Sequence, residues 1–402
     1  MWLLDFFFRP PNRDQFARLY LKAMRRAGVA GPLEYDRANF RIVRGSDGYT
    51  NLENLYREYL ATPRAERSLR MRTWIASFAA SQLELPEDFE DVKPDLRPKI
   101  WSRMAIECLI LQSQLEGSKS LDLALEPLGE HLYLGLVYDL PHSMRSISQE
   151  DLDRWSTGYY EAREIAFENL LETTGSIAGI NEQLYQPITG DNYDACRLLL
   201  VEQWRGLAWQ GDPIAMVANR DSVFIAGSED LDGLRMLLDL TEKALEEPRP
   251  LLATPLRLEG ETWVDWFPDG EHPLYDRFRF LQMKELYSRY QEQKTILEAW
   301  FNSRQEPTFV ASFTVQESKQ GRLSSLCVWS DGVETLLPRT DTIVLFREGQ
   351  NVIAEASWKD VESIVGYLFE PTEYYPERVK VSGFPTPDEL AQLRELSSPP
   401  AV

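Results

Sequence analysis

Between residues 191 and 266 helical patterns alternate with hairpin patterns, and this alternation constrains the fold more than any other feature of the chain. An apolar helical pattern after Asp191 is followed by strand patterns at 213–218 and 223–227, with the turn Asn219-Arg-Asp-Ser222 between them. An amphipathic helix at 230–246 and a second hairpin at 255–266 come next. Helices alternating with antiparallel hairpins are typical of an α+β protein and not of a doubly wound parallel sheet.

The whole chain divides into segments of different pattern, and its 402 residues exceed one ordinary core. We predict a basic helix-hairpin-helix lobe at 1–83, an acidic proline-containing linker at 84–98, a central α/β lobe at 99–272, a connector helix at 273–306 and a C-terminal antiparallel β domain at 307–402. A helix near 358–368 is expected to back the C-terminal sheet. The predicted fold class is therefore α+β, with several lobes of helices and short antiparallel hairpins.

Three local signals are the clearest. Asn12 with Gln15 forms a capping-box pattern before a helix whose buried stripe is expected at Phe16, Leu19, Tyr20, Ala23 and Ala27. Ser148 with Asp151 repeats the capping pattern. The nearly continuous apolar run at 132–138 predicts a central strand.

The apolar start at 1–8 is short, contains Asp5 and lacks a basic n-region, so we expect an edge strand or hydrophobic staple there and no signal peptide.

Charge is unevenly distributed along the chain. Residues 1–80 hold 14 Lys and Arg against 8 Asp and Glu, a net charge of +6. Because the whole chain has a net charge of −21, the remaining residues carry −27. The acidic body argues against nucleic acid as a partner. Arg64, Arg67, Arg70 and Arg72 form a basic patch. It is interpreted either as a solvated face turned toward the acidic body or as a site for an acidic partner. A third interpretation is anion or RNA binding by this lobe, which requires Arg64, Arg67 and Arg70 to be exposed together.

Cysteine and histidine usage restricts the chemistry. Cys108, Cys196 and Cys327 are far apart and odd in number, which predicts free thiols in a reducing, cytoplasmic setting. The three histidines are not spaced as zinc ligands, so no metal site is predicted. No glycine-rich phosphate loop occurs, and we predict no cofactor. No apolar run approaches the roughly 18 to 20 residues of a membrane span.

One polar cluster is a candidate site. It comprises Asn169, Asp191, Asp194, Arg197, Arg220 and Asp221. Two or three carboxylates suit a hard cation such as Mg²⁺, and an arginine suits a phosphate oxygen. The local interpretation is that Asp191 and Asp194 form a helix cap, Arg197 pairs within the helix, the residues at 219–221 make a turn and Asn169 satisfies a backbone group.

The central region resembles the YtpQ family, a bacterial family of unknown function. The matching pieces are Leu132-Tyr-Leu-Gly-Leu-Val-Tyr-Asp139, Phe167-Glu-Asn-Leu170, Tyr193-Asp-Ala-Cys-Arg197 and Ala218-Asn-Arg-Asp-Ser-Val-Phe-Ile225, within about residues 130–270. The resemblance implies a bacterial cytoplasmic protein and supplies no catalytic residue.

These observations favour a non-catalytic protein that binds another protein or a small regulatory ligand. The alternative is a metal-assisted hydrolase of a phosphate ester that uses Asp191, Asp194 and Asp221.

Overall fold

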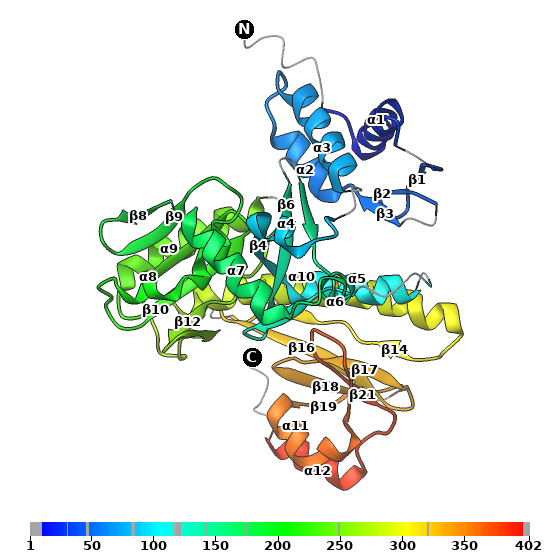
Figure 1. Cartoon of the computed structure of the whole chain (residues 1–402). Helices are drawn as coiled ribbons and strands as arrows, with labels where there is room; N and C mark the ends of the chain where they lie inside the picture. The colour runs from blue at the N-terminus through cyan, green and yellow to red at the C-terminus, as the bar shows by residue number, and fades with distance from the viewer. Residues whose placement is uncertain are drawn as a thin grey trace, which may run out of the picture.

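The computed structural model describes residues 10–29, 31–45, 48–81, 85–115, 117, 122–140, 143–173, 175–247, 250–319, 321–349 and 351–396. Within these ranges the chain is an α+β protein, which confirms the predicted fold class. Three lobes follow one another, with the N-terminal lobe at the top of Figure 1 and the C-terminal lobe at the bottom. The apolar start at 1–8 lies outside the described residues.

The N-terminal lobe packs helices on a small antiparallel sheet of order β1-β2-β3. Its elements are α1 (Arg13–Arg26), β1 (Glu34–Asp36), β2 (Arg41–Val43), β3 (Tyr49–Asn51), α2 (Glu53–Ala61) and α3 (Arg67–Ser81). The predicted capping box of α1 is confirmed by two 2.9 Å hydrogen bonds between Asn12 and Gln15. Phe16, Tyr20 and Met24 are buried, but Leu19, predicted to be in the core, is 46% exposed. One apolar side chain of α1 therefore faces away from the core of the lobe.

The central lobe begins with a sheet built around β6, which is the predicted central strand. The elements are α4 (Phe89–Val92), η2 (Lys93–Asp95), β4 (Leu96–Ser102), α5 (Arg103–Leu115), β5 (Leu125–Leu128), β6 (Leu132–Leu140), β7 (Ser143–Ser146), α6 (Gln149–Arg154) and α7 (Tyr159–Glu172). Strand β6 pairs with β4, β5 and β7. The predicted capping box at Ser148 and Asp151 opens α6.

The prediction of a linker at 84–98 is wrong for the described part of that segment, residues 85–98. Phe89, Val92 and Leu96 are buried in the core, and β4 pairs with β6 from Leu96 to Ser102. Pro94 and Pro98 suggested a linker, but both lie at positions of regular structure where proline is tolerated. Pro94 lies in a 3-10 turn, and Pro98 lies in an edge strand of the sheet.

The second sheet of the central lobe is antiparallel and six-stranded, in the order β13-β12-β10-β11-β9-β8. Its strands and helices are β8 (Ser176–Ile180), β9 (Leu184–Ile188), η3 (Ala195–Leu199), α8 (Val201–Arg205), β10 (Pro213–Asn219), β11 (Ser222–Gly227), α9 (Leu231–Glu246), β12 (Leu256–Glu259) and β13 (Thr262–Asp265). Both predicted hairpins form, β10 with β11 and β12 with β13. The predicted helix after Asp191 is instead a 3-10 helix and a short α-helix, because Leu200 (ψ 65°) leaves the helical conformation.

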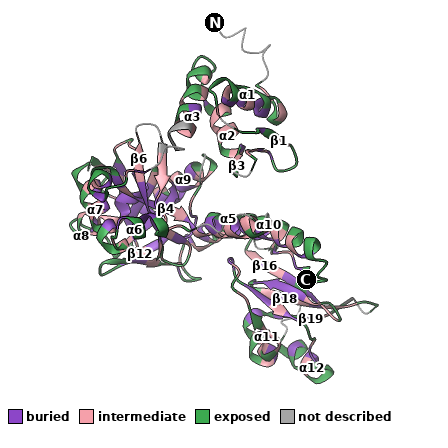
Figure 2. Ribbon diagram, turned by 45° about the vertical axis from the view of Figure 1, so that its right-hand side comes forward, coloured by how far each residue is buried: buried purple, intermediate pink, exposed green. Residues whose placement is uncertain are grey.

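Alternate side chains of β10 and β11 fill two different cores. In Figure 2 the interior of the central lobe, around β4 and α9, is mostly purple, the colour of buried residues. Ala215 and Val217 pack toward Trp204 and the first sheet, whereas Ile214 and Met216 pack toward α9 and α10. Successive side chains of a strand point to opposite faces, so a strand covered on both faces is apolar throughout. This burial places η3 and the turn at 219–222 against the body of the lobe.

A long helix, α10 (Tyr275–Arg304), leads into the C-terminal lobe. That lobe contains β14 (Phe309–Val310), β15 (Thr314–Glu317), β16 (Leu323–Ser330), β17 (Thr335–Pro338), β18 (Thr342–Arg347), β19 (Asn351–Ser357), α11 (Trp358–Val365), η4 (Gly366–Leu368), β20 (Glu370–Pro371), β21 (Arg378–Val381) and α12 (Pro387–Leu396). The predicted antiparallel sheet is wrong in detail. Two four-stranded sheets form, and the pairs β14–β17 and β16–β18 are parallel.

Helix α10 packs on both neighbouring lobes and is more than a connector. Phe278 and Leu281 lie in the core beneath α9, while Leu297 and Phe301 pack with Val310 of the C-terminal lobe. At about 1.5 Å per residue the helix is about 45 Å long, enough to contact both lobes. Among the described residues, no helix combines the length and the apolar character needed to cross a bilayer.

Candidate functional site

Asp191, Asp194 and Arg197 form one ion-pair network inside the central lobe. Arg197 is 2% exposed and donates two hydrogen bonds to the Asp191 carboxylate, at 3.0 and 2.7 Å. It donates a third to the Thr173 carbonyl at 2.8 Å, and Asp194 Oδ1 lies 3.7 Å from its guanidinium. The arginine is therefore bound by protein groups and does not present its charge to a ligand.

Backbone groups bind the same two carboxylates. Asp191 accepts a hydrogen bond from Tyr193 N at 2.9 Å, and Asp194 accepts one from Thr189 N at 3.0 Å. The predicted helix cap is wrong, because the chain turns through Gly190 (φ +70°) before the 3-10 helix begins. Burial opposes ionisation of Asp191, but the hydrogen bonds from Arg197, Tyr193 and Thr189 prevail and lower its pKa.

The other predicted members of the cluster have separate contacts. Arg220 pairs with Asp221 at 3.2 Å and donates to Asn192 Oδ1 at 2.9 Å. Asn169 Nδ2 donates to the carbonyls of Lys93 and Leu96, at 2.7 and 3.0 Å. Asn169 therefore satisfies backbone acceptors, as its local interpretation predicts.

No metal-binding arrangement connects these carboxylates. In the part of the chain that the structure describes, one group of three His, Cys or carboxylate side chains brings its ligand atoms within 4.8 Å of one another, and it does not include Asp191, Asp194 or Asp221. Arg197 pairs with both Asp191 and Asp194, whereas a metal site leaves carboxylates available to the ion. Cys196 is buried, and burial raises the pKa of its thiol, so it is a poor nucleophile.

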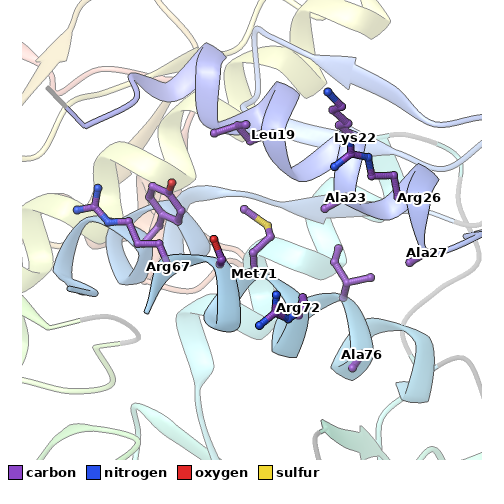
Figure 3. Close-up of a pocket in the computed structure, with 12 residues that line it drawn as sticks. Leu19, Lys22, Ala23, Arg26, Ala27, Arg67, Met71, Arg72 and Ala76 are labelled. Carbon is purple, nitrogen blue, oxygen red and sulfur yellow. The ribbon is translucent and has the colours of Figure 1, made fainter. Parts of the chain in front are cut away.

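The predicted basic patch divides between two surfaces. Arg67 and Arg72 line a groove of about 720 Å³ between α1 and α3 (Figure 3). Arg70 lines a different cleft, of about 520 Å³, which also contains Glu247 and Asp221 of the central lobe. Arg64 is exposed and does not line the groove. Part of the basic lobe thus faces the acidic body, and part faces away from it.

The floor of the groove is apolar. Leu19 and Ala23 from α1 lie across from Met71 of α3 in Figure 3, and Ile75 is buried between the helices. The ring of Tyr59 lies beside Arg67, with 4.9 Å between its centroid and the guanidinium carbon. The exposure of Leu19 is explained by this surface, because its side chain lines the groove.

The rim of the groove carries uncompensated positive charge. Lys22 and Arg26 of α1 join Arg67 and Arg72 of α3, and none of the twelve lining residues is acidic. Among the described residues, Lys22, Arg26 and Arg72 have no hydrogen-bond or ion-pair partner. Arg67 donates to the Thr62 and Leu60 carbonyls, which are neutral. Four cations therefore surround an apolar floor with no carboxylate between them.

Sequence reasoning found the α3 half of this groove and missed Lys22 and Arg26. The missed signal is a spacing: the two cations are four residues apart on α1, and each follows an apolar residue, Leu19 or Ala23, by three positions. Residues three and four apart share one helix face, so α1 has a second, mixed apolar and basic face. No family model, curated protein or solved structure matches this chain.

Proposed function

We propose that this protein is a non-catalytic binding protein whose groove between α1 and α3 receives an acidic amphipathic helix of a partner protein. The observation that carries this proposal is the combination of four cations, no carboxylate and an apolar floor in one groove. A helix with an apolar stripe flanked by Asp and Glu is complementary to it, since helix-in-groove recognition places apolar anchors inside and charges at the rim.

The size of the groove suits a short helix. Its lining residues extend from Leu19 to Ala27 on α1 and from Arg67 to Ala76 on α3. At about 1.5 Å per residue, each wall is roughly 12 to 14 Å long, or two to three helical turns. A partner helix of that length offers apolar side chains at positions i, i+3 or i+4, and i+7.

Three considerations favour a peptide over nucleic acid. The floor is mostly aliphatic, and Tyr59 is the single aromatic ring among the lining residues, whereas single-stranded nucleic acids bind to series of stacked rings. The chain outside residues 1–80 carries −27, which repels a polyanion that extends beyond the groove. A short acidic helix avoids most of that repulsion, because charges are screened over about 8 Å at physiological salt.

The cytoplasmic setting and the YtpQ-like affiliation belong to the same proposal. Three buried free thiols support a reducing compartment, and the ordered motifs within about residues 130–270 support the affiliation. Neither supplies a reaction, which is consistent with a binding role.

Reversing the groove's charges is expected to weaken binding of an acidic amphipathic peptide roughly 10- to 100-fold. The variant is Lys22→Glu/Arg26→Glu/Arg72→Glu, and Arg67 is left in place because it holds backbone carbonyls. Each reversed exposed charge contributes about 0.5 to 1 kcal/mol. The measurement is fluorescence anisotropy of a labelled peptide of about 18 residues with leucines on one helical face and glutamates beside them.

Arg18→Glu is the matched control, because Arg18 is exposed on the same helix and does not line the groove. It should leave the dissociation constant nearly unchanged, and Leu19→Asn should weaken binding through the floor. Equal losses for Arg18→Glu and for each single groove reversal would contradict the proposal, because they would indicate attraction by net charge alone. Tighter binding of a single-stranded oligonucleotide than of the peptide, lost in the triple variant, would replace the peptide by nucleic acid.

A further inference from the structure

Glu130, His131 and Asp265 converge where the turn between β5 and β6 meets the end of β13. A ligand atom from each lies within 4.8 Å of those from the other two. The two segments are fitted closely: Glu130 N–H donates to Asp265 Oδ2 at 2.7 Å, and a Cβ added to Gly129 (φ +63°) would lie 3.2 Å from Asp265 Oδ1. The arrangement is therefore held by the backbone and does not depend on side-chain conformations alone.

The two nearby arginines, Arg103 and Arg289, form ion pairs with other carboxylates. Arg103 donates to the Glu130 backbone carbonyl at 3.1 Å, and its guanidinium pairs with Glu107 at 3.5 Å. Arg289 pairs with Glu285. Among the described residues, the carboxylates of Glu130 and Asp265 form no ion pair, so two carboxylates without a cationic partner lie beside the imidazole.

One imidazole nitrogen is already held. His131 Nδ1 lies 2.5 Å from the Tyr375 hydroxyl, whose oxygen also accepts a hydrogen bond from Arg289 Nη1 at 2.9 Å. Metal-binding histidines commonly have their second nitrogen held in this way, which orients the ring. In the tautomer in which Nδ1–H donates to the Tyr375 oxygen, the lone pair of Nε2 is available to a metal ion.

We propose that Glu130, His131 and Asp265 bind a divalent transition-metal ion of the Zn²⁺ class. One imidazole and two carboxylates match the ligand types of zinc sites with three protein ligands, which keep a fourth position open. Bonds of about 2.1 Å in tetrahedral geometry separate ligand atoms by about 3.4 Å, so binding draws the three atoms together by at most about 1.4 Å. Glu130 is exposed and can rotate to close this gap.

The test is a titration of the chelator-treated full-length protein with Zn²⁺ alone, followed by calorimetry, and with Co²⁺, followed by its visible absorption bands. We expect one ion per chain. Asp265→Asn keeps an acceptor for Glu130 N–H but removes the charge, and it should weaken binding at least tenfold. His131→Gln should weaken Zn²⁺ binding similarly and shift the Co²⁺ bands, because it removes the nitrogen ligand. Tyr375→Phe should weaken binding about tenfold while keeping a nitrogen-ligand spectrum.

Asp269→Asn is the matched control, because Asp269 lies four residues after Asp265 and accepts a local hydrogen bond from Glu271 N at 3.0 Å. Circular dichroism of each variant checks that the fold is retained. Affinity equal to the wild type in both Asp265→Asn and His131→Gln would overturn the proposal, as would the absence of a saturable site. Tighter binding of Mg²⁺ than of Zn²⁺ would also contradict it, since Mg²⁺ prefers oxygen ligands to imidazole.

Discussion

Arg197→Met is expected to lower the free energy of unfolding by about 3 kcal/mol or more, because breaking a buried ion pair leaves its carboxylates without compensation. Arg197 is 2% exposed, and its removal leaves the buried Asp194 and the partly buried Asp191 without their cation. It also leaves the Thr173 carbonyl without a donor. The measurement is urea unfolding at pH 7, with hydrogen exchange of peptides covering residues 189–205 to locate the loss in the central lobe.

Arg220→Met is the control for this prediction, since it is the same substitution in the same predicted polar cluster. Arg220 pairs with Asp221, whose side chain is 54% exposed, and exposed pairs contribute at most about 1 kcal/mol. A loss in Arg197→Met no larger than that in Arg220→Met would refute the structural role assigned to the network. Asp191 and Asp194 would then again be candidates for binding a ligand.

The stability difference between the wild type and Arg197→Met is expected to depend on pH through the ionisation of Asp191. Burial opposes its ionisation, but hydrogen bonds from Arg197, Tyr193 and Thr189 lower its pKa in the folded protein. Such a carboxyl group adds stability above its unfolded pKa of about 3.9, and this contribution is lost as the pH falls through the folded value. Without Arg197 the lowering shrinks. The stability difference between wild type and Arg197→Met should therefore be largest above about pH 4 and decrease below it.

The elements that the sequence predicts well are those set by neighbours in the chain. The capping boxes at Asn12 and Ser148 and the hairpin around residues 219–222 depend on contacts within a few residues, and all three form. A capping side chain bonds its own helix, and a tight turn brings consecutive strands together, so the residues concerned are adjacent in the sequence.

The features that the sequence does not predict depend on distant partners. Residues 85–98 have the prolines and acids of a linker, yet β4 is folded because β6, more than thirty residues later, pairs with it. The parallel pairing of β16 with β18 likewise follows from how the C-terminal lobe closes and not from either strand's pattern. Charge patterns located Arg67 and Arg72, and the spacing of Lys22 and Arg26 marks a basic face of α1, but only the packing of α1 on α3 shows that these faces meet in one groove. Glu130 and Asp265 are separated by most of the central lobe, and no spacing rule connects them.

Arg378→Met is expected to destabilise the C-terminal lobe by about 2 to 4 kcal/mol, because it leaves buried acceptors unpaired. Arg378 is 0% exposed, and its acceptors are all neutral: Gln293 Oε1 at 2.6 Å and the carbonyls of Ala311 and Leu336 at 2.8 and 3.0 Å. Burial lowers its pKa to about 10, so the guanidinium is charged at pH 7. Leu336 O keeps a second bond, from Ala311 N, which limits the loss.

Gln293 links this cation to α10, and that link determines where the loss should be seen. Gln293 Nε2 donates to the Pro376 carbonyl at 2.8 Å while its oxygen binds Arg378, so the helix and the loop before β21 share one hydrogen-bond network. Hydrogen exchange in α10 near residue 293 should therefore accelerate together with exchange in β21 when Arg378 is replaced. Lys380→Met is the control, because Lys380 lies in the same strand, its side chain is 34% exposed and it pairs with Glu334 at 3.1 Å, so its loss should be below about 1 kcal/mol. Acceleration confined to β21 would show that α10 is held by the central lobe alone, and that the C-terminal lobe unfolds without it.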